Sequence, residues 1–322
     1  MKTFLGVDGG GTQTRFVLID EAGKVLASHL EGPAYYLEIG LEQLREMLAR
    51  GIRQTLRAGQ VRAEDLSYAF LGLPAYGEDL KLLPALNAAP SQALPHGRYR
   101  CDNDMVCGWA GALAGADGIN MVCGTGSIAY GEFAGRSARA GGWGELFSDE
   151  GSSYWLAREG LRLFSRMSDG RQPRGPLYEQ VRRHFALQSD LDLCAAIYGK
   201  DIAQRSQLAQ LSKLVTAAAA AGDEGARGLF EAAARELADM VEAVRLNLQL
   251  PANVSIPVSS SGGMFQPGNG LREALSAQLQ RRSPQYRFVE PLLPPDVGAA
   301  IQAARLNGTP LGADSLRALS RR

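Results

Sequence analysis

Two glycine-rich turns, each directly after a short apolar stretch, are the parts of this sequence best suited to chemistry. The first is Asp8-Gly9-Gly10-Gly11-Thr12, and the second is Gly124-Thr125-Gly126-Ser127. Because glycine has no side chain, backbone N–H groups in such turns can approach a phosphate closely. One turn alone could be an ordinary hairpin, but two matching turns predict a triphosphate clamped from both sides. The predicted phosphate-binding residues are Gly10, Gly11, Thr12, Thr14, Gly124, Gly126 and Ser127.

Acidic residues follow two of the expected strands. Asp8 is predicted to face a Mg²⁺ ion through water, because magnesium dehydrates reluctantly and is usually held by one or two carboxylates plus phosphates. In Asp102-Asn103-Asp104, an acid at a strand end can reach a ligand and act as general base for a hydroxyl nucleophile. Asp104 is the predicted base. The alternative for Asp104 is a helix N-cap that accepts backbone N–H bonds.

Two further segments carry residues suited to a sugar and a nucleotide base. The segment 141–152 combines Gly142 and Trp143 with Asp149 and other acids. Its carboxylates could accept hydrogen bonds from sugar hydroxyls, and its indole could form a flat apolar wall; alternatively, the loop only packs a Trp into the core. Gly262-Gly263 follows an apolar stretch, where bare backbone could lie against a planar base. A simple strand-to-helix turn explains that pair equally well.

The elements that must position these residues form a pattern that occurs twice. A chain of 322 residues exceeds the roughly 250–300 residues of a single core, so two domains are expected. Strands are expected at 3–7, 14–19, 25–30, 68–73 and 99–101, and again at 119–123, 127–133, 137–140, 254–259 and 286–289. Helices are expected at 41–56, 106–114, 150–167, 174–187, 206–221, 224–249, from 270 and at 297–306. The predicted domains are 1–115, with the terminal helix 297–322 as a candidate addition to it, and 116–296.

The overall composition narrows the possible partners. Lysine and arginine number 34 and aspartate and glutamate 34, so no long-range field favours nucleic acid or an anionic membrane. No apolar stretch reaches the roughly 20 residues that span a bilayer, and Asp8 comes too early for a signal peptide. A cytoplasmic protein is expected. The four cysteines show neither C-x-x-C nor zinc-ligand spacing and are predicted to be reduced.

Taken in order, these five motifs resemble those of the N-acetylglucosamine and glucosamine kinases. That family lies within the BadF/BadG/BcrA/BcrD ATPase-like group, which also contains the activator ATPases of benzoyl-CoA reductase and 2-hydroxyacyl-CoA dehydratase. The resemblance implies an α/β, two-domain actin-like ATPase (ribonuclease H-like) fold, with a duplicated βββαβα core and a cleft between domains. It also implies an ATP- and Mg²⁺-dependent phosphorylation of an amino sugar. The implied roles are proton removal by Asp104, adenosine binding by Gly262 and Gly263, and sugar binding by Thr125, Gly142, Trp143 and Asp149.

The sequence departs from that family on the expected sugar side. Where relatives carry an asparagine, this chain has Gly32-Pro33-Ala34-Tyr35-Tyr36, and Tyr35 is placed in the sugar site. Two other functions stay open: an activator ATPase, which needs exposed paired cysteines, and a non-catalytic nucleotide sensor, against which the presence of Asp104 argues. A homodimer is expected, with ATP and a small amino sugar as the partners.

Overall fold

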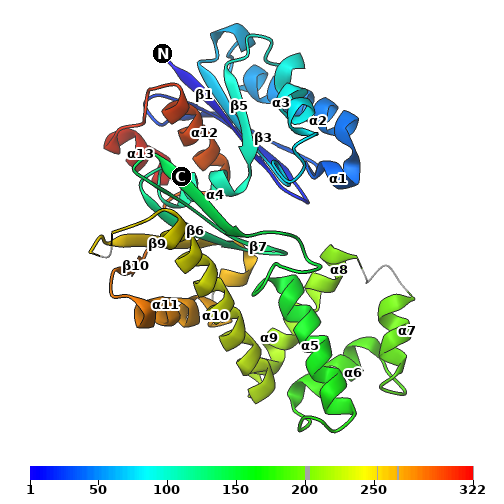
Figure 1. The fold of residues 1–322 in the computed structure, drawn as a ribbon. Helices are drawn as coiled ribbons and strands as arrows, with labels where there is room; N and C mark the ends of the chain where they lie inside the picture. Colours follow the sequence, from blue (N-terminus) through cyan, green and yellow to red (C-terminus); the bar gives the residue numbers. More distant parts are fainter. Residues whose placement is uncertain (200–203, 252, 267, 322) are drawn as a thin grey trace. The chain divides into compact units, whose positions relative to one another are not determined.

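The computed structural model describes residues 1–199, 204–251, 253–266 and 268–321, which form two compact units. The first unit contains Met1–Asp117 together with Glu290–Arg322, and the second contains Gly118–Val289. Each unit is built around one five-stranded sheet (Figure 1). The C-terminal segment therefore belongs to the same unit as the N-terminal strands.

The sheet of the first unit joins an antiparallel meander to two parallel strands. Its strand order is β3-β2-β1-β4-β5. Asp8 on β1 pairs with Arg15 on β2 and with Gly72 on β4. The strands are β1 (Thr3–Gly9), β2 (Thr14–Asp20), β3 (Val25–Glu31), β4 (Tyr68–Leu73) and β5 (Tyr99–Asn103).

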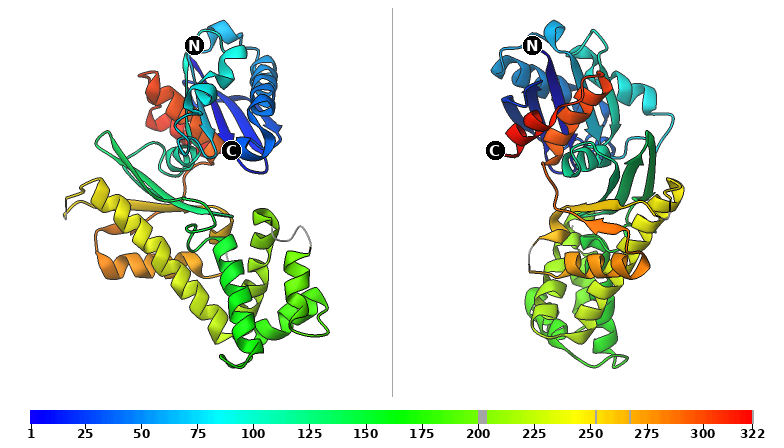
Figure 2. Two further views of the ribbon diagram at one scale, coloured as in Figure 1. Left: turned by 45° about the vertical axis from the view of Figure 1, so that its right-hand side comes forward. Right: turned by 90° about the vertical axis from the view of Figure 1, so that its left-hand side faces the viewer.

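Helices cover both faces of this sheet. Leu5 and Val7 of β1 and Phe16 of β2 share a core with the buried residues of α2. Gly6, which lies between Leu5 and Val7 in β1, touches α12 instead. Because successive strand residues point to opposite faces, α2 and α12 lie on opposite sides of β1 (Figure 2). The helical segments are α1 (Tyr36–Ile39), α2 (Leu41–Ala58), η1 (Ala63–Asp65), α3 (Leu83–Ala88), η2 (Ala89–Gln92), α4 (Met105–Ala112), α12 (Pro295–Leu306) and α13 (Ala313–Ser320).

The second unit repeats this topology. Its strand order is β10-β9-β6-β7-β8, in which β6, β7 and β8 take the places of β1, β2 and β3, and β9 and β10 those of β4 and β5. The pairing directions also agree, because β6–β7 and β7–β8 are antiparallel while β6–β9 and β9–β10 are parallel. The strands are β6 (Gly118–Cys123), β7 (Ser127–Phe133), β8 (Arg136–Gly141), β9 (Ile256–Ser261) and β10 (Tyr286–Phe288).

The second unit is the more helical one. The long helix α10 buries Phe230, Leu237 and Val241 on the face that its spacing predicts. Asp223 caps α10 by accepting a hydrogen bond from Ala226 N, and its other oxygen accepts one from Leu177 N in α6. The helical segments are α5 (Ser153–Ser168), α6 (Pro176–Phe185), α7 (Asp192–Tyr198), α8 (Arg205–Gln210), α9 (Ser212–Ala220), α10 (Glu224–Asn247), η4 (Gly263–Phe265) and α11 (Leu271–Arg282).

Several helices differ from the sequence-based prediction: α1, α3 and α7 were not predicted, and two predicted helices have other bounds for a local reason. The helix predicted over 206–221 is wrong as a single element, because α8 and α9 are separated at Leu211. There the hydrogen bonds tighten to three-residue steps, from Leu211 N to Leu208 O and from Leu214 N to Leu211 O. The helix predicted from 150 begins later, since the Ser152 hydroxyl caps α5 by accepting from Trp155 N at 3.2 Å.

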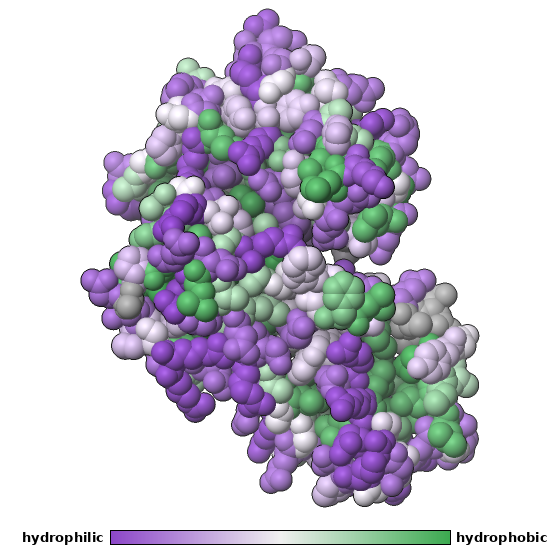
Figure 3. Space-filling view, viewed as in Figure 1, coloured by the Kyte–Doolittle hydropathy of each residue, from purple (hydrophilic) through white to green (hydrophobic). Residues whose placement is uncertain are grey.

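The surface is mainly polar. On the face seen in Figure 3, hydrophilic residues predominate and hydrophobic side chains form separate small groups. No helix in the described part of the chain combines the length and the apolar character that a membrane span requires.

A close backbone contact joins α12 to α4 at Gly298. A methyl group on this residue would overlap the Cys107 carbonyl and the Gly111 backbone nitrogen. We expect Gly298→Ala to lower the free energy of unfolding by about 1–3 kcal/mol or more, because backbone cannot yield as a side chain can. Gly228→Ala is the control. Gly228 is exposed in the second turn of α10 with open space around it, so alanine there should raise stability by up to about 1 kcal/mol.

Urea unfolding followed by circular dichroism measures both changes. If Gly298→Ala unfolded at the same urea concentration as the unaltered protein, the close contact between α4 and α12 would be disproved.

Candidate functional site

The site residues predicted in the first unit gather where β1 and β5 end. Asp8 is the penultimate residue of β1, and Asp104 follows β5 directly and precedes α4. Gly72 lies between Asp8 and Asp104. It pairs with Asp8 across β1 and β4, and a methyl group on it would lie 2.9 Å from the Asp104 Cα. Glycine at this position therefore lets Asp104 approach the strand that carries Asp8.

Asp104 stands at the start of α4 without serving as its side-chain cap. Within the described part of the chain, Met105 N donates to the Asn103 side chain at 3.1 Å and makes no capping hydrogen bond of good geometry to Asp104, although its N–H lies close enough to lower the pKa of that carboxyl. Burial raises the pKa of Asp104 to about 6. A carboxylate with this pKa is ionised at neutral pH and is a stronger base than an ordinary aspartate.

Asp102, the other acid in this segment, is already engaged. One of its oxygens accepts from Asn103 N at 2.9 Å, and the other lies 3.4 Å from the Arg100 guanidinium. The geometry therefore favours Asp104 over Asp102 as the acid that can accept a proton from a ligand.

Charged groups surround Asp8. Burial, followed by the nearby carboxylates of Asp104 and Asp296, raises the pKa of Asp8 well above its usual value, and Arg15 opposes this. Asp296 itself is buried, and within the described residues its Oδ1 has no hydrogen-bond partner. Three carboxylates near one arginine leave an excess of negative charge, which a bound cation would compensate.

The first glycine turn connects to the loop that carries Tyr35. Gly10 N donates to Gln13 O at 3.1 Å, and Gly10 O accepts from Ala34 N at 2.9 Å. The Thr14 side chain is buried, and its hydroxyl donates to Gly32 O at 2.8 Å. Thr14 therefore anchors the loop in front of Tyr35, which immediately precedes α1.

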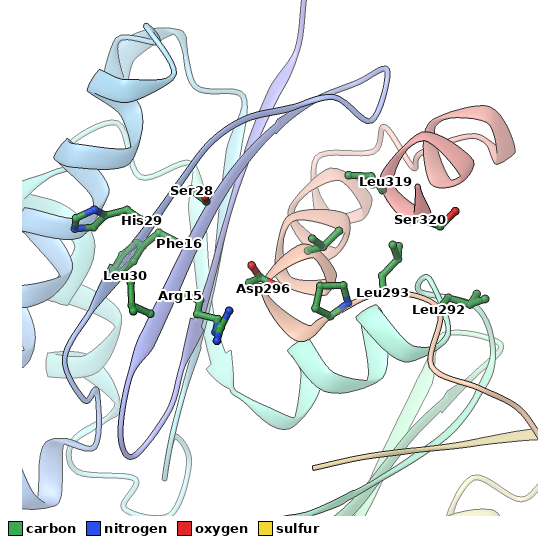
Figure 4. Close-up of a pocket in the computed structure, with 12 residues that line it drawn as sticks. Arg15, Phe16, Ser28, His29, Leu30, Leu292, Leu293, Asp296, Leu319 and Ser320 are labelled. Carbon is green, nitrogen blue, oxygen red and sulfur yellow. The ribbon is translucent and has the colours of Figure 1, made fainter. Parts of the chain in front are cut away.

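A cavity of about 530 Å³ lies within the first unit, beside this site. Its lining includes Arg15, Leu30, Leu292 and Asp296, which come from β2, β3, the segment that leads into α12 and the first turn of α12 (Figure 4). Among the described residues, none of the residues predicted to bind ATP, magnesium or sugar lines this cavity. It is a neighbouring feature of the first unit and not the predicted site itself.

In the second unit, Asp149 lies against the second glycine turn. Its Oδ1 accepts from Ser127 N at 3.2 Å, and a methyl group on Gly126 would lie 2.8 Å from its Oδ2. The Ser127 hydroxyl donates to Glu150 O at 2.7 Å. Gly124 O and Thr125 O accept from Ser153 N and Tyr154 N at the start of α5. The turn is thus tied at several points to the segment that the sequence assigns to the sugar.

The Gly262-Gly263 pair adjoins the same turn. Gly262 has a φ of +103°, and any side chain on it would overlap the backbone of Cys123, directly before Gly124. Gly263 begins the short helix η4. Because glycine adopts positive φ without strain, this position favours glycine over every other residue.

Trp143 is exposed to solvent and does not pack into the core. Its exposed fraction is 69%, and the Arg139 guanidinium lies 5.7 Å from the ring centroid. Gly142 has a φ of +68° and packs against Ile128. The core-packing alternative for this tryptophan is therefore wrong, and its indole is accessible to a ligand.

The cysteines that the structure describes do not form the exposed pair that an activator ATPase needs. Cys101, Cys107 and Cys123 are buried and reduced, and Cys194 is exposed and reduced. Burial raises the pKa of the Cys101 thiol to about 12, which keeps it protonated and inert. Within the described residues, no group of three or more His, Cys, Asp or Glu side chains could hold a metal ion by itself.

Two arginines near the predicted residues were not found from the sequence. Arg15 could have been found by counting the β1–β2 register back from the glycine turn, because it lies opposite Asp8. Arg205 carries no such signal. It begins α8, 56 positions beyond Asp149, yet its Nη2 lies 2.5 Å from the Asp149 Oδ2.

Comparisons with known proteins agree with this arrangement. The BadF/BadG/BcrA/BcrD ATPase family model matches residues 5–303. The chain is 27% identical over 311 residues to an N-acetyl-D-glucosamine kinase of Dictyostelium discoideum, covering 94% of this chain and 98% of that protein. It is 28% identical over 292 residues to an N-acetylmuramic acid/N-acetylglucosamine kinase of Clostridium acetobutylicum, covering 90% and 94%.

The fold is shared with a solved structure as well. A candidate N-acetylglucosamine kinase of Chromobacterium violaceum superposes with a TM-score of 0.72 at 27% identity, over 93% of this chain and 98% of that one. The expectation of a two-domain actin-like ATPase fold is confirmed. Because the family model covers nearly the whole length, the resemblance of the five motifs is also confirmed, and the chain belongs to the BadF/BadG/BcrA/BcrD ATPase family.

Proposed function

We propose that this protein transfers a phosphoryl group from ATP to a hydroxyl group of an amino sugar, with N-acetylglucosamine or glucosamine as the substrate. The observation that carries the proposal is Asp104, a largely buried acid of raised pKa near Asp8 and its glycine turn, in a chain aligned almost end to end with amino-sugar kinases. The cytoplasm is the proposed location, because ATP is the proposed donor. The homodimer is a separate expectation, which sedimentation would test.

Asp104 is the proposed general base. In phosphoryl transfer the protein contributes mainly by positioning the reactants and neutralising charge, so the base needs only to accept the hydroxyl proton as the bond to phosphorus forms. Asp104 is ionised at neutral pH and makes no capping bond within the described residues. Its carboxylate is therefore available to the acceptor hydroxyl.

The glycine turns are the proposed phosphate sites, and Asp8 is the proposed magnesium ligand. Backbone at Gly10, Gly11, Gly124 and Gly126 can approach phosphate oxygens. Asp8 fits a magnesium site, because Asp104 and Asp296 add negative charge beside it. When bound through water to Asp8, Mg²⁺ would neutralise charge on the triphosphate. Gly262 and Gly263 are proposed to lie against the adenosine.

The segment with Trp143 and Asp149 is the proposed sugar site. A buried carboxylate against the second turn can accept hydroxyl hydrogen bonds, and an exposed indole offers a flat apolar face. Thr125, Gly142 and Tyr35 complete the proposed set.

The function is tested by an ADP-release assay with glucosamine, N-acetylglucosamine, N-acetylmannosamine and glucose. We expect at least one amino sugar to raise ADP release well above the rate without sugar. ATP binding without stimulation by any sugar would favour a nucleotide sensor instead.

Replacing the proposed base is expected to stop turnover selectively. Asp104→Asn should lower kcat by at least ~10²-fold and leave ATP affinity nearly unchanged, because a general base typically contributes this much. Asp102→Asn is the matched control and should have a much smaller effect, since Asp102 is engaged by Arg100. Steady-state kinetics of both variants decide the choice, and a reversal of the two effects would show that Asp102 is the base.

The pH dependence follows from the same carboxylate. Because Asp104 acts unprotonated and its pKa is raised to about 6, kcat/KM should rise with pH through about 6 and level off above it. The residual activity of Asp104→Asn should lack this inflection. A wild-type profile that is flat from pH 5 to 8 would contradict the assignment.

Replacing Asp8 separates metal binding from stability. Asp8→Asn should raise the Mg²⁺ concentration for half-maximal rate by roughly tenfold, because one carboxylate is lost from the metal. The raised pKa of Asp8 means that its charged form is disfavoured in the folded protein, so Asn should leave the melting temperature unchanged or higher. An unchanged Mg²⁺ requirement would remove Asp8 from the metal site.

A further inference from the structure

Asp149 is held in an unusual position for a carboxylate. It is 2% exposed and has a φ of +60°, a conformation that residues other than glycine rarely adopt. Its Oδ1 accepts from Ser127 N, and its Oδ2 accepts from Arg205 Nη2 at 2.5 Å. A buried carboxylate is costly unless it is paired, and among the residues that the structure describes Arg205 is the cation that pairs with Asp149.

The position of Arg205 is fixed by the packing of α8. It is the first residue of that helix, whose Leu208 forms a small core with Leu211 and with Ala157 of α5. The segment that carries Asp149 leads directly into α5. Helix α5 therefore anchors both partners of the ion pair: α8, which carries Arg205, packs against it, and the segment with Asp149 leads into it.

Arg205 also approaches a second acid of the same segment. Its Nε lies 3.4 Å from the Glu145 carboxylate, and this buried Nε has no hydrogen-bond partner among the described residues. Arg205 thus bridges Glu145 and Asp149, at the two ends of the stretch that contains the exposed Leu146 and Phe147. Loss of the guanidinium would release both ends of this stretch.

We propose that Arg205 is a positioning residue for the acceptor sugar, which holds the Asp149 carboxylate charged and oriented for hydrogen bonds from sugar hydroxyls. This role rests on the proposed function. An ionised carboxylate can accept about four hydrogen bonds, so the bonds from Ser127 and Arg205 leave part of the acceptor capacity of Asp149 unused.

The electrostatics of the pair agree with this role. Burial raises the pKa of Asp149, and Arg205 opposes that rise, whereas Glu145 adds to it. The buried thiol of Cys123 also faces Asp149, and its pKa is raised by burial and by this carboxylate. Without Arg205, the surroundings of Asp149 would therefore favour the protonated acid, which donates one hydrogen bond and accepts poorly.

Arg205→Gln tests the proposal, with N-acetylglucosamine and glucosamine as probes. We expect the sugar KM to rise at least ~10-fold while the ATP KM changes less than roughly twofold, because one charge-assisted hydrogen bond is lost at the sugar site. Arg205→Lys should recover part of the loss, since it keeps the charge but not the planar fork. Arg162→Gln is the matched control, because its ion pair with Glu159 lies on the surface of α5.

A double-mutant cycle distinguishes positioning from direct contact. In an Asp149→Asn background, Arg205→Gln should no longer raise the sugar KM, because the group through which it acts is gone. An equal rise in both backgrounds would mean that Arg205 binds the sugar itself and would overturn the positioning role.

Stability measurements keep a structural role apart from a functional one. A lower melting temperature of Arg205→Gln with an unchanged sugar KM would overturn the proposal and leave only a structural ion pair. Arg205→Lys provides the kinetic comparison if Arg205→Gln does not fold. Absence of turnover by the wild-type protein would overturn the proposed function and this role together, whereas wild-type turnover with unaltered variants would overturn this role alone.

Discussion

Close contact between backbones, made possible by glycine, is the constraint on which the first unit depends. Gly6 lets β1 lie directly on α12, Gly298 lets α12 lie on α4, and Gly72 lets the start of α4 approach β4. These contacts form one continuous stack of strand and helix backbone. Its consequence is chemical, because burial raises the pKa of Asp8 and the nearby carboxylates of Asp104 and Asp296 raise it further. The arrangement favours an ionised Asp8 only when a cation is bound.

The second unit reaches a related result by a different route. Its glycine turn also follows the first strand of a repeated topology, but the acid beside it comes from a loop between β8 and α5. Asp149 is compensated there by an arginine and a backbone N–H group. One unit therefore has three neighbouring acids near its glycine turn, and the other has a single acid paired with an arginine.

Much of this could be predicted from the sequence, because the signals were local. The repeated strand pattern predicted two similar halves, and the resemblance of the motifs to a known family implied an actin-like fold, which is confirmed. The break between α8 and α9 was missed because Leu208 and Leu211 continue a helical spacing, and only tight turns and packing on α5 interrupt it. Arg205 was missed because its contact with Asp149 depends on how an inserted helix packs. The assignments of individual site residues stay predictions.

The identity of the reaction product is the most direct test of the central claim. The protein should be incubated with ATP, Mg²⁺ and N-acetylglucosamine or glucosamine, and the products analysed by ³¹P nuclear magnetic resonance and mass spectrometry. A sugar monophosphate formed in equal amount to ADP is the predicted result. ADP accompanied only by inorganic phosphate, with the sugar unaltered, would contradict phosphoryl transfer to a sugar and identify the protein as an ATPase.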